Sequence, residues 1–235
     1  MFGFDLSLLI ITLVFAGIGM AVSARLKSVF KKYSEEGLRS NLTGAQVAQR
    51  MLNDSGIFDV TIESVPGKLT DHYNPMNKTV NLSPEVFSGR SISAAAVAAH
   101  ECGHAVQHAK QYPWLQMRSQ LVPIVNFSSK ALNWVYIAMI FLAFSANLYN
   151  QALLAIIILQ AAITLFTVIT LPVEMDASNR ALIWLRSSGV ATSGAEMDGA
   201  STALKWAGRT YIVAALASIA TLAYFVMSYM GRRDE

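Results

Sequence analysis

The sequence predicts a mainly α-helical, multi-pass membrane protein with about four transmembrane helices and a small α+β region beside the membrane. Hydrophobic residues make up 54% of the 235 residues and charged residues only 14%, which is too apolar for an ordinary soluble domain. The charges are also unevenly spread, since none of the 43 residues between Lys130 and Glu174 is charged. One long polar stretch, residues 25–130, contains the sequence His-Glu-Cys-Gly-His within a predicted helix.

Four charge-free apolar segments are long enough to cross a bilayer, which takes about 20 residues in a helix. They are residues 6–24, 131–149, 152–173 and 210–230. The middle two form a predicted transmembrane hairpin, residues 131–173, with an uncharged turn near residues 147–151. Pro172 is expected to kink or end its second helix. The last segment and a short tail make up residues 210–235.

The first apolar segment has two interpretations. Residues 21–24, Ala-Val-Ser-Ala, resemble a signal-peptide cleavage site. However, no Lys or Arg precedes the segment, whereas Arg25, Lys27, Lys31 and Lys32 follow it. This asymmetry favours an uncleaved anchor, residues 1–24, with its N-terminus outside the cell.

The basic residues also predict which side of the membrane the polar region faces. Residues 25–130 contain 12 Lys and Arg, residues 174–209 contain four, and the hairpin turn has none. Both polar regions are therefore expected in the cytoplasm, in a protein of the cell (inner or plasma) membrane. Arg232 and Arg233 in the tail oppose this assignment, although two acidic residues follow them. Because most basic residues flank the membrane, the net charge of +3 does not indicate nucleic-acid binding.

Turn and capping signals divide the polar regions into elements. Thr43 is expected to cap a short amphipathic helix that ends at residues 53–56. Residues 60–65 alternate like a strand, residues 74–77 form a turn, and residues 78–83 form a second strand before Pro84 opens a helix. Residues 114–130 are predicted as an amphipathic helix. The segment 174–209 is predicted as an amphipathic helix, a loop at residues 189–194 and a further helix over residues 196–209.

The helix predicted around residues 91–110 carries the residues that point to chemistry. Ser91 or Ser93 can cap it. Residues four apart lie on one helix face, so His100 and His104 can bind one Zn²⁺. Glu101 would lie beside the open metal position, where it can take a proton from zinc-bound water and hand it to a leaving amine. A chance match on a buried helix has the same sequence, but three of the chain's four histidines fall within nine residues, which favours the metal site.

A catalytic zinc ion needs a third protein ligand. No histidine follows His108, so a downstream ligand must be a carboxylate. Glu174 is favoured because it ends the uncharged run, where a carboxylate is costly unless it has a partner. Asp176 can bind instead, or orient a histidine, and Glu174 can also simply mark where a helix leaves the membrane. The remaining downstream carboxylates are Glu196, Asp198, Asp234 and Glu235.

Several residues are candidates for supporting roles. His108 lies one turn beyond the motif and suits a supporting or surface position better than a ligand position. His72 can stabilise an oxyanion or form a structural hydrogen bond, and Tyr211 is similarly ambiguous. The predicted strand residues before the motif helix form either an edge along which an extended peptide lies or a plain structural hairpin. These residues are Thr79, Val80, Asn81 and Leu82.

Longer segments are more specific than the histidine motif alone. They are LTDHYNP, the strand ending in NLS, AVAAHECGHAVQH, residues 118–123, TLPVEMDASNRAL and TYIVAAL. Through them, residues 69–215 resemble the YugP-like family of bacterial membrane zinc metallopeptidases. That family looks distantly related to the HtpX-like and CaaX-processing membrane proteases, which are gluzincins.

The resemblance implies a set of site residues. In gluzincins of this kind, a Glu on a later helix is the third zinc ligand, and an Asp four residues on supports the site. Carried over, this implies His100, His104 and Glu174 as ligands of one zinc ion and Glu101 as the base. The supporting Asp falls on a serine here, Ser178, so Asp176 or Asn179 is expected to provide the support instead.

These observations together predict a membrane-embedded zinc endopeptidase whose substrates are polypeptides associated with the lipid bilayer. The alternative is a non-catalytic membrane scaffold or partner-binding protein that keeps a structural zinc. Glu101 argues against the scaffold, because a structural site normally closes all four metal positions and has no use for a base. A transporter fits less well, because the interiors of the spans contain no ionisable residues.

Overall fold

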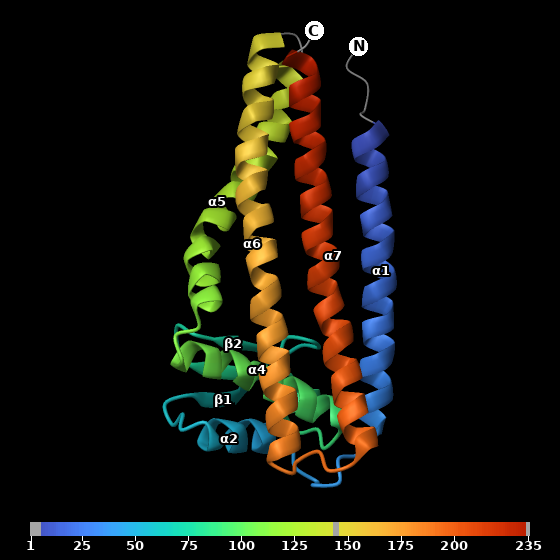
Figure 1. Ribbon diagram of the computed structural model, residues 1–235, viewed down its shortest axis with the longest axis vertical. Coiled ribbons are helices and arrows are strands. Elements are labelled where there is room, and N and C mark those ends of the chain that lie inside the picture. Colours follow the sequence, from blue (N-terminus) through green and yellow to red (C-terminus); the bar gives the residue numbers. More distant parts are fainter. Residues whose placement is uncertain (1–5, 143–145, 234–235) are drawn as a thin grey trace. The chain divides into compact units, whose positions relative to one another are not determined.

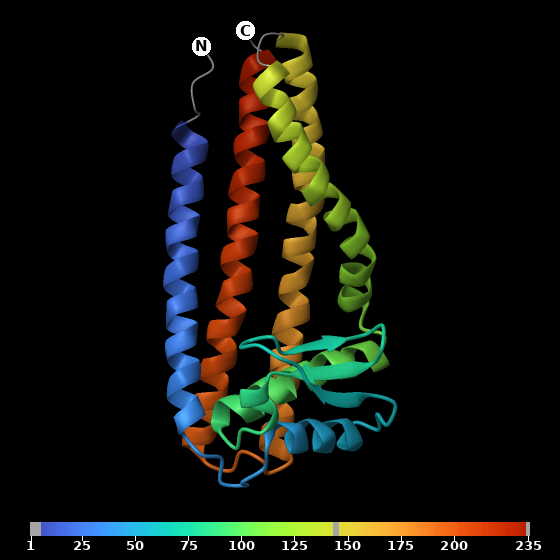
Figure 2. The same ribbon diagram turned by 180° about the vertical axis from the view of Figure 1, so that it is seen from behind.

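The computed structural model describes residues 6–142 and 146–233, and most of them are helical (Figures 1 and 2). The chain folds into two compact units. A helical unit contains Met1–Ala21, Met117–Leu171 and Thr210–Glu235, and an α+β unit contains Val22–Gln116 and Pro172–Arg209. The elements in order are α1 (Leu6–Glu35), α2 (Gly44–Asp54), β1 (Thr61–Ser64), β2 (His72–Asn74), β3 (Thr79–Leu82), α3 (Pro84–Phe87), α4 (Ile92–Ala109), α5 (Pro113–Leu142), α6 (Ala146–Ser187) and α7 (Gly194–Arg233).

Three helices, rather than the four predicted, are long and apolar enough to cross a membrane among the residues that the structure describes. They are Leu6–Glu35, Leu148–Ser187 and Gly194–Gly231. The predicted span over residues 131–149 is wrong because α5 ends at Leu142. The apolar part of α5 that follows Lys130 is therefore short, and Asn133 interrupts it.

The helices are also more continuous than predicted. The turn expected at residues 147–151 is wrong, because α6 begins at Ala146 and includes those residues. Pro172 does not end the helix, which runs through it to Ser187. In the same way, α7 joins the expected helix over residues 196–209 to the last span. A helix is the conformation that satisfies most backbone groups in an apolar environment, so the loss of one N–H at a proline does not stop it there.

The core of the helical unit combines apolar packing with polar contacts. Leu132, Leu153, Ile156 and Phe225 form a buried cluster. On α6 and α7, the buried Thr164 and Ser218 hydroxyls lie 2.8 Å apart, and Gln160 donates a hydrogen bond to the same serine. Such contacts are typical of associating membrane helices.

The α+β unit contains a sheet of three strands in the order β1-β3-β2. β3 pairs in parallel with β1 and antiparallel with β2. The prediction that β3 is an edge strand is therefore wrong: both of its sides are paired, and Thr79, Val80, Asn81 and Leu82 are all buried. The strand β2 was not predicted, and it places its outer side at the edge of the sheet.

The motif helix α4 packs against α2, β2 and β3 (Figure 2). Its predicted cap is confirmed, because Ser91 Oγ accepts a hydrogen bond from the Ala94 N–H. The predicted cap of α2 is confirmed as well, since Thr43 and Gln46 form a complete capping box. The alanine-rich first half of α4 is buried, so its small side chains let the neighbouring elements approach closely.

Candidate metal centre

The three predicted ligands come together inside the α+β unit. α4 supplies His100 and His104. Glu174 belongs to the part of α6 that lies in this unit, which begins at Pro172. Glu174 Oε2 lies 3.3 Å from His100 Nε2 and 3.5 Å from His104 Nε2. Potential ligand atoms of all three residues lie within 4.8 Å of one another. His104 and Glu174 are buried and His100 is partly buried.

Hydrogen bonds on the far side of each imidazole fix the orientation of the rings. His100 Nδ1 lies 3.1 Å from Ser178 Oγ, and His104 Nδ1 lies 3.0 Å from Gln107 Oε1. Gln107 Nε2 donates to Val173 O at 2.8 Å, so its Oε1 must accept a hydrogen bond from His104. The proton of neutral His104 is therefore on Nδ1, and the lone pair on Nε2 faces Glu174.

This donor set fits a zinc ion. Two imidazole nitrogens and a carboxylate oxygen converge in a buried place, and acceptor atoms this close repel one another unless a cation or added protons lie between them. Two histidines and a glutamate are a known ligand set of catalytic zinc, which leaves a fourth position open. The site thus has the chemistry of a zinc centre.

The support of His100 differs from the prediction. Ser178, which occupies the position of the expected Asp, contacts His100 itself. It lies four residues after Glu174 on α6 and therefore on the same helix face. Asp176 supports His104 only through Gln107, because it accepts a hydrogen bond of 2.8 Å from Gln107 Nε2. It also accepts a hydrogen bond of 2.6 Å from Arg180 Nε. Asn179 is exposed.

Glu101 lies beside the ligands and is buried. Its Oε2 accepts a hydrogen bond of 3.0 Å from the backbone N–H of Tyr73. Burial raises the pKa of Glu101 to about 7, and the negative charges of Glu174 and Asp71 act in the same direction, against the opposing effect of His100. A carboxyl group with a pKa near neutrality is suited to exchange protons with a substrate.

Other candidates from the sequence lie elsewhere. His108 Nδ1 is 2.8 Å from the Tyr73 hydroxyl, and exposed His72 lies with Nδ1 2.7 Å from Thr70 O. Tyr211 belongs to the helical unit, and its role stays a prediction. Among the other carboxylates, Glu196 accepts hydrogen bonds from the backbone N–H groups of three residues, Arg39, Thr192 and Ser193. Asp198 is exposed. Asp234 and Glu235 lie outside the described residues.

Two further residues of the site, Gln107 and Tyr73, were missed in the sequence. Gln107 is fully buried and lies three residues after His104, and this spacing on one helix was the available signal. Tyr73 contacts Glu101 through its backbone N–H, so this role cannot be recognised from the type of its side chain. Its role depends on β2, which brings it to Glu101.

Gln107 is expected to support zinc binding, because it links His104 to the helix that carries Glu174. Gln107→Leu keeps the volume but removes these hydrogen bonds, and we expect zinc affinity to fall about 10- to 100-fold. Competition with a chelating dye measures this affinity. Gln49→Leu, which removes an exposed glutamine bond to Asn53 on α2, is the control. Equal affinity in the Gln107 and Gln49 variants would contradict the proposed support.

Gly103 lets α4 and α6 approach closely at the site. A Cβ atom at this position would lie 2.6 Å from the backbone oxygen of Ala177, which cannot move without moving α6. We expect Gly103→Ala to destabilise the protein by about 1–3 kcal/mol and to weaken zinc retention, because α6 carries Glu174. Thermal unfolding in detergent and zinc analysis measure the two effects. Gly208→Ala, on a helix with nothing within 4 Å of the new Cβ, is the control; an equally mild effect of both would exclude tight packing at Gly103.

Comparisons with known proteins show the family of this chain. The family model described as "Putative neutral zinc metallopeptidase" matches residues 8–230. The "Putative membrane protease YugP" of Bacillus subtilis (strain 168) is 42% identical over 230 residues, which cover 97% of this chain and 100% of that protein. No solved structure matches the chain. The chain therefore belongs to the family described as "Putative neutral zinc metallopeptidase".

Proposed function

We propose that this membrane zinc peptidase is an endopeptidase of the gluzincin type, with Glu101 as the general base. The observation that carries the proposal is the convergence of His100, His104 and Glu174 next to a buried carboxylate that is not a ligand. A purely structural zinc site has no use for such a carboxylate. Membership of a zinc peptidase family supports the same reaction.

Each residue has a defined task in this reaction. His100, His104 and Glu174 would hold the zinc ion, which, when bound, supplies Lewis-acid polarisation and makes water acidic near neutral pH. Glu101 accepts a proton from the attacking water and passes it to the leaving amine. The hydrogen bond from Tyr73 holds one oxygen of Glu101 in place and leaves the other available for proton transfer.

The outer side of β2 is the proposed position of the substrate backbone. The Tyr73 N–H points to Glu101 and therefore away from β3, so this side of the strand faces the site. An extended polypeptide can pair with such an edge through main-chain hydrogen bonds to groups other than the Tyr73 N–H, which is already donated to Glu101. Pairing there would bring a peptide carbonyl beside the metal ligands.

We further propose that the site faces the cytoplasm and acts on polypeptides at the membrane surface. Residues 25–130 and 174–209 hold 16 of the 18 Lys and Arg residues, which favours the cytoplasmic side. Glu174 directly follows the uncharged stretch of residues 131–173. A substrate bond that reaches this ligand is therefore expected to lie close to the bilayer.

Cleavage of a membrane-tethered reporter tests the proposed activity. We expect purified full-length protein in liposomes to cut a reporter within its juxtamembrane segment. Chelation should abolish cleavage, and zinc, but not magnesium, should restore it, because the donor set prefers zinc. Fragment analysis by mass spectrometry identifies the cut bond. Cleavage by metal-free protein would refute the zinc mechanism. Equal cleavage of the same segment without its membrane tether would refute the preference for membrane substrates. A protein that binds zinc but cleaves nothing would favour the scaffold function.

A further inference from the structure

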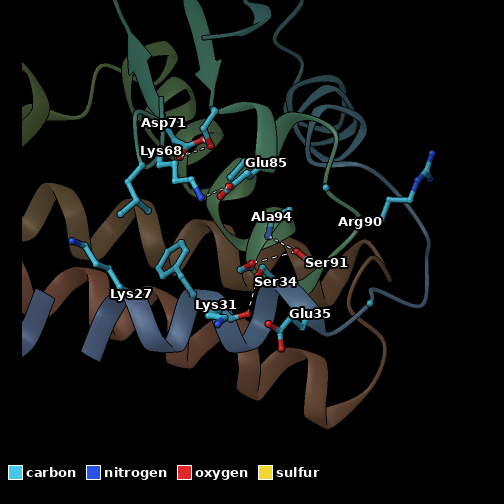
Figure 3. A pocket seen from close by; sticks show the side chains of 17 residues that line it. Lys27, Lys31, Ser34, Glu35, Lys68, Asp71, Glu85, Arg90, Ser91 and Ala94 are labelled. Carbon is cyan, nitrogen blue, oxygen red and sulfur yellow. Dashed lines mark hydrogen bonds and ion pairs between the residues drawn. The ribbon is translucent and has the colours of Figure 1, made fainter. Parts of the chain in front are cut away.

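A separate hollow of about 1090 Å³ lies within the α+β unit (Figure 3). One face of α1 lines it together with the loop from Lys68 to Asp71 and parts of the segment from Ser83 to Ala94. None of the candidate metal ligands belongs to its lining. We propose that this hollow binds the headgroup of an anionic phospholipid, with Lys27 and Lys31 as the ligands of the phosphate.

Two lysines of the lining have no acidic partner. Lys27 and Lys31 lie one helical turn apart on α1, and neither forms an ion pair with an acidic side chain in the described part of the chain. The other two cations of the hollow are engaged. Lys68 Nζ lies 2.7 Å from Glu85 Oε1, and Arg90 donates to the backbone oxygen of Asn41 and points away from the hollow in Figure 3. The free positive charge is therefore on α1.

The acidic residues of the lining leave this end of the hollow open to an anion. Lys68 compensates Glu85, and Asp71 accepts hydrogen bonds from the backbone N–H and hydroxyl of Ser83. Glu35 lies one helical turn after Lys31 without forming an ion pair with it in the described part of the chain, and eight residues beyond Lys27, which is about 12 Å along a helix. A phosphate group is therefore expected nearer Lys27 than Glu35.

The rest of the lining suits an amphiphile better than a simple ion. Ser34, Ser91 and Ser93 also line the hollow, where Ser34 donates a hydrogen bond to the backbone oxygen of Lys31 and the hydroxyls of Ser91 and Ser93 bond to each other. Phe30 and Leu69 add apolar surface, and Leu69 is 53% exposed in a left-handed conformation with φ +57°. Such a conformation is costly for a leucine and is typical of functional loops. The volume far exceeds that of one phosphate ion but can hold a headgroup and its glycerol.

The position of the lysines in the chain selects a membrane lipid over an acidic polypeptide. Lys27 follows the charge-free residues 6–24 by three residues, about 4.5 Å along α1. Lipid phosphates lie where such an apolar stretch ends, and basic residues there attract anionic lipids. The lining of the hollow includes Ser91, Ser93 and Ala94 at the start of α4, the helix that carries the two candidate histidine ligands. Lipid binding is therefore expected to stabilise the α+β unit.

Lipid titration of the purified full-length protein in detergent tests this proposal, whether or not the protein is a peptidase. Native mass spectrometry measures bound lipid, and thermal unfolding measures stabilisation. We expect phosphatidylglycerol to bind and to raise the unfolding temperature, and phosphatidylcholine and inorganic phosphate to have little effect. Each lysine near an anionic headgroup contributes about fivefold in affinity, so Lys31→Gln should weaken binding about fivefold and the double variant with Lys27→Gln about 30-fold.

Lys32→Gln is the matched control. Lys32 is the next residue on α1 and loses the same charge, but it lies outside the hollow and pairs with Glu36 at 3.8 Å. We expect this variant to bind phosphatidylglycerol like the wild type. Equal losses in Lys31→Gln and Lys32→Gln would overturn the proposal in favour of unspecific attraction. Stabilisation of the wild type by inorganic phosphate equal to that by the lipid would overturn the proposal in favour of a site for free anions. If Lys31→Gln bound the lipid like the wild type but had a raised KM for acidic peptides, the hollow would be a peptide site instead.

Discussion

Glu174→Ala is expected to remove most of the zinc from the purified protein. The wild type should retain about one zinc ion per chain, because three protein ligands hold it. The variant keeps only the two histidines, and its vacated position in α6 cannot supply another donor. Elemental analysis after dialysis measures the content, and proteolysis of the membrane-tethered reporter should be lost together with the zinc.

Asp198→Ala controls for the removal of a downstream carboxylate. Asp198 is another carboxylate downstream of the uncharged run, but it is exposed on α7, so this variant should keep its zinc. Thermal unfolding of both variants separates loss of the ligand from loss of the fold. Full zinc retention in a folded Glu174→Ala protein would show that the metal binds elsewhere, and the link between the site and the membrane would lose its main support.

The candidate metal ligands could be recognised in the sequence because their signals are local. The spacing of His100 and His104 places them on one helix face without any tertiary information. Glu174 stood out because a charged residue directly after 43 uncharged residues needs a reason. Neither inference required knowledge of how α4 and α6 pack.

The supporting residues could not be predicted because their roles depend on packing between distant segments. Ser178 contacts a histidine 78 residues earlier in the chain, and Gln107 contacts Val173, 66 residues later. These contacts depend on the close approach of α4 and α6 at Gly103. Their residue types alone, a serine and a glutamine, predict no role.

The strand β2 and the continuation of α6 through Pro172 were not predicted, because they also depend on contacts between segments. β2 has three residues and no alternating apolar pattern, so its pairing with β3 rather than its own propensity makes it a strand. Pro172 was expected to kink or end a helix, as prolines do in water-exposed helices. α6 nevertheless continues through Pro172, and the continuous helix brings Glu174 and Ser178 to the site on successive turns.

Glu101→Gln is expected to abolish nearly all proteolysis while the protein keeps its zinc. Glutamine has the size of glutamate and can still accept the hydrogen bond from Tyr73 N–H, but it cannot take a proton from water. Loss of such a general base lowers kcat/KM by about 10²- to 10⁴-fold. Zinc content should match the wild type, because Glu101 is not among the ligands. Full proteolysis in this variant would exclude Glu101 as the base.

The pH dependence of kcat/KM provides a second test of the same residue. Burial raises the pKa of Glu101 from 4.5 to about 7 without a metal ion, and a bound cation nearby would lower it again. Because the reaction requires the deprotonated carboxylate, activity should fall as the pH drops through a value between these two limits. The residual activity of Glu101→Gln should lack this decline, whereas Glu63→Gln, which changes an exposed carboxylate on β1, should keep it. An unchanged acid limb in Glu101→Gln would assign the titrating group to another residue and would leave the buried carboxylate without a role in proton transfer.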